Sequence, residues 1–170
     1  MKDFNGKVAF ITGAAHGFGK AIATKAASLG MKLTLVDQDK AALSKVADEL
    51  SKSTEVLKIV ADVTEEKNVD NAVDEAMKKY NEIDLLVNDA GVAVPGPIWE
   101  LPTRDWEWIL HADLMSQVYA LKKVIPIMMK QENGGDILNV ASAAGLLTAP
   151  GMPAYYATKF AVVGMTEAVA

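Results

Sequence analysis

A serine, a tyrosine and a lysine near the end of the chain have types and spacing that suit proton transfer. Tyr155 and Lys159 stand four positions apart, so they would lie on one face of a helix. A phenol ionises near about pH 10 in water, and an ammonium group beside it favours the phenolate form. Ser142 can hold a substrate oxygen by hydrogen bond. The three side chains could therefore move a proton at an alcohol or carbonyl oxygen while a hydride moves at the carbon.

Three glycines follow the first apolar run of the chain, with the spacing Gly-x-x-x-Gly-x-Gly. They are Gly13, Gly17 and Gly19, and a helix-like segment begins among them. Glycine permits a tight turn and lets backbone N–H groups approach a pyrophosphate, which the positive end of the following helix also attracts. A strand-to-helix turn that only favours glycine is the alternative. The position between a strand and a helix favours phosphate binding.

Strand-like and helix-like segments alternate along the chain, which is typical of a parallel sheet with crossover helices. Pro126 is expected to kink or shorten the long helix that contains it, and Thr64 is expected to cap its helix. The expected strands are 8–12, 33–36, 56–60, 83–87 and 136–140. The expected helices are 17–29, 40–50, 64–80, 103–130 and 153–170.

The expected strands are continuous apolar runs, which indicates strands buried on both faces by helices. The prediction is one α/β domain over residues 1–170, with a doubly wound parallel sheet. A ligand in such a sheet lies across the carboxyl ends of the strands, so functional residues should follow the strands directly.

Asp37 follows the second expected strand, where a carboxylate can bind both hydroxyls of an adenosine ribose and repel a 2′-phosphate. It favours NAD over NADP, and Asp39 is the better cap for the next helix. His16 is a counter-signal, because a cationic histidine could accept a 2′-phosphate, although it can also be an ordinary loop residue. Asp62 and Val63 follow the third strand, where Asp62 can start the next helix.

These motifs together resemble the short-chain dehydrogenase/reductase family over nearly the whole chain, from Lys7 to Ala170. The resemblance implies a Rossmann fold, a nicotinamide cofactor and oxidation of a secondary alcohol or reduction of a ketone. By resemblance, the catalytic residues are Ser142, Tyr155 and Lys159, with Asp113 at a fourth catalytic position. The resemblance also implies that Asp62 and Val63 flank the adenine, as the alternative to a start of the next helix at Asp62. The implied cofactor-binding residues are Gly13, His16, Gly17, Phe18, Gly19, Asp37, Asp62, Val63, Asn88, Ala90, Gly91, Tyr155 and Lys159.

The chain departs from the family pattern at two positions, where aspartate replaces asparagine. Asp89 stands in the segment that resembles Asn-Asn-Ala-Gly, and it keeps only the acceptor half of the amide's hydrogen bonds. Asp113 stands where the family's fourth catalytic asparagine lies; a carboxylate near Lys159 would stabilise the ammonium and compete for it. These substitutions keep an alternative open, namely a nucleotide-binding module without turnover.

The composition excludes several other classes of protein. There are no cysteines, the net charge is −5 without a basic block, and His16 and His111 are the only histidines. Disulfides, nucleic-acid binding and a metal site are therefore not expected. Without a long apolar run or a signal peptide, the chain is expected to be cytoplasmic and free of membrane.

The chain ends inside the expected helix that carries Tyr155 and Lys159. The family continues with two further strands, so the chain is expected to be an incomplete domain whose fifth strand forms a sheet edge. Such an edge needs another chain for cover, or it leaves the domain only marginally stable. The family usually pairs through its long helix and its catalytic helix. A homo-oligomer is therefore expected. The identity of the substrate stays open, because in the family much of the region that sets substrate specificity follows the catalytic helix.

Overall fold

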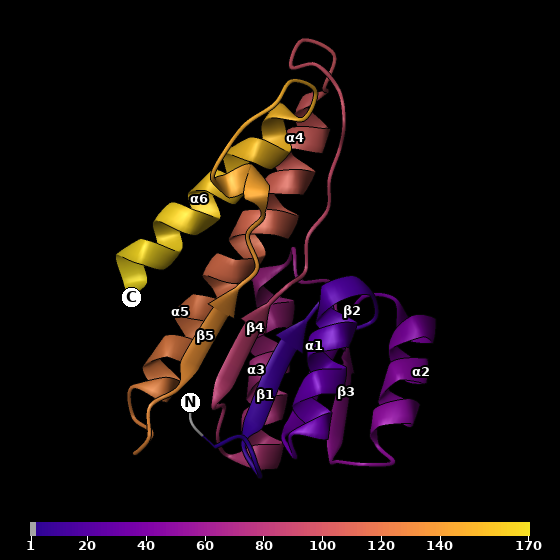
Figure 1. The fold of residues 1–170 in the computed structure, drawn as a ribbon, viewed down its shortest axis with the longest axis vertical. Coiled ribbons are helices and arrows are strands. Elements are labelled where there is room, and N and C mark those ends of the chain that lie inside the picture. Colours follow the sequence, from indigo (N-terminus) through magenta and orange to yellow (C-terminus); the bar gives the residue numbers. More distant parts are fainter. Residues whose placement is uncertain (1–2) are drawn as a thin grey trace.

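A parallel sheet of five strands forms the centre of the computed structural model, which describes residues 3–170 (Figure 1). The strand order is β3-β2-β1-β4-β5, and each neighbouring pair is parallel. The chain starts at the middle of the sheet, winds outward to one edge and then returns to wind toward the other. The strands are β1 (Val8–Thr12), β2 (Lys32–Asp37), β3 (Val56–Val60), β4 (Leu85–Asn88) and β5 (Asp136–Asn139).

Helices cover both faces of the sheet and close two apolar cores. One core joins the sheet to α1 and α2, and the other joins it to α3 and α5. This arrangement confirms the predicted doubly wound α/β fold. The helical segments are α1 (Gly17–Ser28), α2 (Lys40–Leu50), α3 (Glu66–Tyr80), α4 (Thr103–Ile109), the π-helical turn η1 (Leu110–Met115), α5 (Ser116–Met128), the 3-10 turn η2 (Ala143–Gly145) and α6 (Pro153–Val169).

The two edge strands correct the expectation that all strands are buried on both faces. β1 is buried throughout, but β3 and β5 each have two exposed residues. An edge strand has a neighbour on one side only, and helices reach over it incompletely. Leu138 of β5 is accordingly 44% exposed. β5 forms an edge as expected.

The expected long helix over 103–130 is found as an unbroken helical stretch of residues 103–128, but a π-helical turn that was not expected lies inside it. α4 ends at Ile109, η1 follows, and α5 begins at Ser116. A π turn widens the helix by one residue and shifts the faces that its side chains present. α5 continues for two residues past Pro126, to Met128, so the main irregularity lies at η1 instead.

Thr64 does not cap the third helix as predicted, since α3 begins two residues later, at Glu66. The reason is Asp62, whose Oδ1 accepts the N–H and the hydroxyl hydrogen of Thr64 at 2.9 and 2.7 Å. This local turn engages Thr64 before the helix starts. The Asp39 cap is confirmed, because its carboxylate accepts the N–H groups of Ala41 and Ala42.

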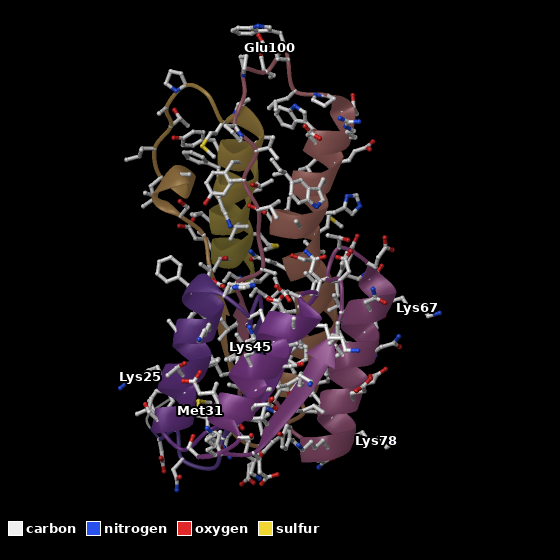
Figure 2. The ribbon with its side chains drawn as sticks, turned by 90° about the vertical axis from the view of Figure 1, so that its right-hand side faces the viewer. Lys25, Met31, Lys45, Lys67, Lys78 and Glu100 are labelled. Carbon is white, nitrogen blue, oxygen red and sulfur yellow. The ribbon has the colours of Figure 1, made fainter. Side chains whose placement is uncertain are left out.

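Two loops and a helix pair extend beyond the carboxyl end of the sheet, at the top of Figure 1. The loop of residues 89–102 leads into α4 and extends beyond the loop before α6. A hydrogen bond of 2.7 Å from Gly96 N–H to the Gly151 carbonyl joins the two loops. Figure 2 shows Glu100 at the far tip of the first loop. Within residues 3–170, no helix is long and apolar enough to cross a membrane.

Candidate active site

The glycine loop between β1 and α1 is packed so closely that two of its glycines have no room for a side chain. Gly13 has a φ of +67°, and a Cβ there would lie 2.9 Å from the backbone nitrogen of Ala90. A Cβ on Gly19 would overlap the carbonyl oxygen of Gly13. The loop therefore packs the start of α1 closely against the end of β4. Glycine is needed at these positions for this close packing as well as for the geometry of the turn.

Asp37 lies at the end of β2 and holds the glycine loop from the side. Its Oδ2 accepts the N–H of Ala15 at 3.0 Å, and its Oδ1 accepts the N–H of Asp39 at 2.9 Å. His16 leans toward Asp39, with Nε2 3.1 Å from a carboxylate oxygen. The Ala42 N–H and then His16 lower the pKa of Asp39. Asp39 therefore stays anionic beside the loop.

A cavity of about 390 Å³ lies over the carboxyl ends of the first four strands. It contains most of the predicted adenosine-side residues, together with Trp108 and Ala112, which the sequence did not suggest. The predicted residues that line it are Gly13, His16, Gly17, Asp37, Asp62, Val63, Ala90 and Gly91.

A second cavity lies beside the first and contains the predicted catalytic residues. Ser142, Tyr155 and Lys159 line it together with Phe18. Asp89, Gly91 and Val92 line both cavities, so the two form one trough from Asp37 to Lys159.

Asn88 lines neither cavity. It is buried, and its Nδ2 donates to the Asn139 side chain at 2.8 Å. Its structural role is to tie β4 to β5; a part in cofactor binding stays a prediction.

The serine, the tyrosine and the lysine meet because β5 and α6 deliver them to one point. Ser142 follows β5, and its Oγ accepts the N–H of Ala144 at 3.1 Å, which starts η2. Lys159 Nζ lies 5.5 Å from the centre of the Tyr155 ring and 3.3 Å from the Val140 carbonyl oxygen. Only 4% of Lys159 is exposed. A buried lysine beside a phenol is an arrangement that could assist proton transfer at a substrate oxygen.

Of the two aspartates that depart from the family pattern, Asp89 lines this trough, whereas Asp113 is fully buried and lines neither cavity. Asp89 Oδ2 accepts the N–H of Gly19 at 2.7 Å, which confirms that it keeps the acceptor bond of an amide. Burial raises the pKa of Asp89, against the opposing effects of that N–H and of Lys159. Asp113 Oδ2 lies 3.4 Å from Lys159 Nζ, so the carboxylate is near the lysine, which was the condition for its expected effect on the ammonium. Burial likewise raises its pKa, while the Val92 N–H and Lys159 oppose the shift.

This fold and this trough define a dinucleotide-binding α/β protein with a Ser-Tyr-Lys site. The family model described as short chain dehydrogenase matches residues 7–170, and the chain belongs to that family. It is 65% identical over its full length to the CLA biosynthesis dehydrogenase/reductase of Lactiplantibacillus plantarum, and 36% identical over 97% of its length to 3beta-hydroxysteroid dehydrogenase 2 of Eggerthella lenta.

Solved structures agree with this assignment. A short chain dehydrogenase/reductase from Burkholderia phymatum in complex with NAD superposes with a TM-score of 0.97 at 42% identity, over 99% of this chain and 60% of that one. NAD⁺-bound xylitol dehydrogenase superposes with a TM-score of 0.94 at 34% identity, over 99% and 65%. The chain spans 60% and 64% of the length of the two curated relatives.

Proposed function

We propose that the protein is an NAD-dependent oxidoreductase that interconverts a secondary alcohol and a ketone. The observation that carries the proposal is the shared trough, in which Ser142, Tyr155 and Lys159 border the cavity that begins at the glycine loop. The family membership supports it. A panel of secondary alcohols that includes a 3β-hydroxysteroid, assayed for NADH formation with the full-length protein, tests it directly.

The residues of the trough fit a dinucleotide in shape and in hydrogen bonding. The glycine loop excludes side chains at Gly13 and Gly19, so a phosphate group can approach the backbone and the start of α1. Asp37 would accept hydrogen bonds from the ribose hydroxyls at one end, and Lys159 would donate to the second ribose at the other. When bound, the nicotinamide supplies the acceptor or donor of the hydride.

Tyr155 exchanges the proton with the substrate oxygen in this mechanism. In the oxidation direction its phenolate accepts the proton of the alcohol as the hydride leaves the carbon, and in reduction its phenol returns the proton. Ser142 donates a hydrogen bond to the same oxygen and orients it. Lys159 keeps positive charge beside the ring, which favours the phenolate.

Asp37 should set the preference for NAD over NADP. We expect Asp37→Ser to raise kcat/KM with NADP and lower it with NAD, changing their ratio by about tenfold to a hundredfold, because one repulsive charge and two ribose hydrogen bonds are lost. Asp48→Ser removes an equal charge from the exposed side of α2 and should leave the ratio unchanged. Steady-state kinetics with both cofactors measure the effect; a constant ratio in Asp37→Ser would contradict this role.

Asp89 should couple cofactor binding to proton uptake. Its carboxylate lines both cavities, where a diphosphate would pass, and its pKa is already raised by burial. A second anion nearby favours the protonated form further, so affinity for NAD should fall, by up to about tenfold, as pH rises through the pKa of Asp89. In Asp89→Asn the affinity should be higher and this dependence absent. Calorimetry in buffers of different ionisation enthalpy measures the proton uptake, and equal uptake in both forms would count against the idea.

A nucleotide-binding module without turnover is the second candidate function. The carboxylates at positions 89 and 113 favour it, because both place negative charge beside Lys159. The same alcohol panel separates the candidates: NAD binding without NADH formation in the full-length protein would support the module.

We also propose a homo-oligomer. Its support is the incompletely covered edge at β5, with exposed Leu138, and exposed Phe160 on α6. Size-exclusion chromatography at several concentrations, together with a thermal melt, tests it. A protein that stays monomeric at all concentrations and melts cooperatively would exclude the oligomer.

A further inference from the structure

The π-helical turn η1 places residue 113 beside Lys159, buried beneath the site, and leaves its backbone carbonyl to a side-chain partner. A widened turn frees carbonyl groups from their usual partners. Here the side chains of the next turn bind two of these groups: Ser116 Oγ donates to the Ala112 carbonyl at 2.6 Å, and Gln117 Nε2 donates to the Asp113 carbonyl at 3.0 Å. With its carbonyl engaged by Gln117, Asp113 meets the site through its carboxylate.

The carboxylate of Asp113 is enclosed and faces the catalytic lysine. Asp113 is 0% exposed. One oxygen, Oδ1, accepts the Val92 N–H at 2.6 Å, which fixes the orientation of the group. The other, Oδ2, has no aligned hydrogen bond among residues 3–170, and it lies 3.4 Å from Lys159 Nζ. The contact is therefore a buried ion pair in a medium that screens charge weakly.

Among the described residues, three ionisable side chains that face Lys159 come from three different elements. Tyr155 comes from α6 itself, Asp113 from η1, and Asp89 from the end of β4. The end of β5 contributes neutral groups, the Val140 carbonyl and Ser142. Among the described residues that line the trough, Lys159 is the one lysine or arginine, so Asp113 acts on the cation that faces the phenol.

We propose that Asp113 is a positioning residue that pairs with Lys159 and offsets part of the positive charge that Lys159 presents to Tyr155. The inference rests on the proposed oxidoreductase function. Its consequence is an enzyme in which alcohol oxidation requires a higher pH than the same enzyme with a neutral amide at position 113. Asparagine is the matched replacement: its oxygen can still accept the Val92 N–H, but its other end carries N–H groups and no charge.

The first test is the pH dependence of kcat/KM for alcohol oxidation by the full-length protein and its Asp113→Asn variant. The acid limb should move to lower pH by about one unit in Asp113→Asn, because an opposite charge within contact changes protonation on this scale. Activity on that limb should rise up to about tenfold. Asp105→Asn, on the neighbouring helix α4 and outside both cavities, is the control and should leave the profile in place.

The second test does not depend on turnover. Ultraviolet difference titration of the NAD-free protein, with Tyr155→Phe subtracted in each background, follows the phenolate of Tyr155 alone. Its midpoint should move to lower pH in Asp113→Asn. A shifted titration without turnover in either form would support the ion pair and contradict the proposed function. An unchanged midpoint in a folded variant, or a uniform loss of activity without a shift of the profile, would overturn the proposal for Asp113.

Discussion

Tyr155→Phe will lower kcat/KM for the alcohol by about a thousandfold, which is the scale that a positioned general acid–base contributes. The variant loses one oxygen atom and keeps the ring that lies 5.5 Å from Lys159 Nζ. The packing of α6 should therefore survive, as should the affinity for NAD within about threefold, since the glycine loop and Asp37 are untouched. Steady-state kinetics and calorimetry with NAD, both on the full-length protein, separate the chemical defect from a binding defect.

The neighbouring phenol supplies the control for this prediction. Tyr156 carries the same group one position along α6, where the residue four places further on is Phe160 in place of a lysine. Tyr156→Phe should keep most of the activity. If the two variants lose activity equally, or if Tyr155→Phe retains it, then Tyr155 is not the proton-transfer group.

The sequence predicted those features that depend on short, local patterns. The glycine spacing fixes a loop that the structure confirms through the missing room at Gly13 and Gly19. The helix cap at Asp39 is predictable, because capping requires only a carboxylate near the N–H groups two and three residues further along the chain. The meeting of Ser142 with Lys159 also follows from topology, since both come from the carboxyl side of the sheet.

The sequence could not predict features that depend on how distant segments pack. A π turn of six residues has no regular hydrophobic period by which it can be recognised. The sequence pattern therefore predicts one long helix across η1. The contact between Asp113 and Lys159 could be expected only on the condition that the two residues are close. The sequence does not settle that condition, because it depends on the distance between η1 and α6. The exposure of β3 and β5 depends on the strand order, which places both at edges.

Gly19→Ala will remove NAD binding almost entirely, with an affinity loss of about a hundredfold or more, because the added methyl group has no space. It would overlap the Gly13 carbonyl oxygen and approach Asp89 Oδ2 at 2.8 Å, and the first of these atoms belongs to backbone that cannot rotate away. The loop must shift to admit it, at a cost of about 1–3 kcal/mol of stability, and the shift displaces the N–H groups that would face a phosphate.

Gly17→Ala is the matched comparison, because the two glycines differ in the reason that glycine is needed. Gly17 has a φ of +49°, but a Cβ there meets no atom within 4 Å, so the substitution costs about 1–2 kcal/mol of backbone strain without a collision. We expect it to lower the melting temperature but retain NAD binding within about tenfold. Calorimetry and thermal melts of both variants measure the difference. Equal loss of affinity in the two would mean that backbone strain, and not the contact between α1 and the turn at Gly13, sets the shape of the phosphate site.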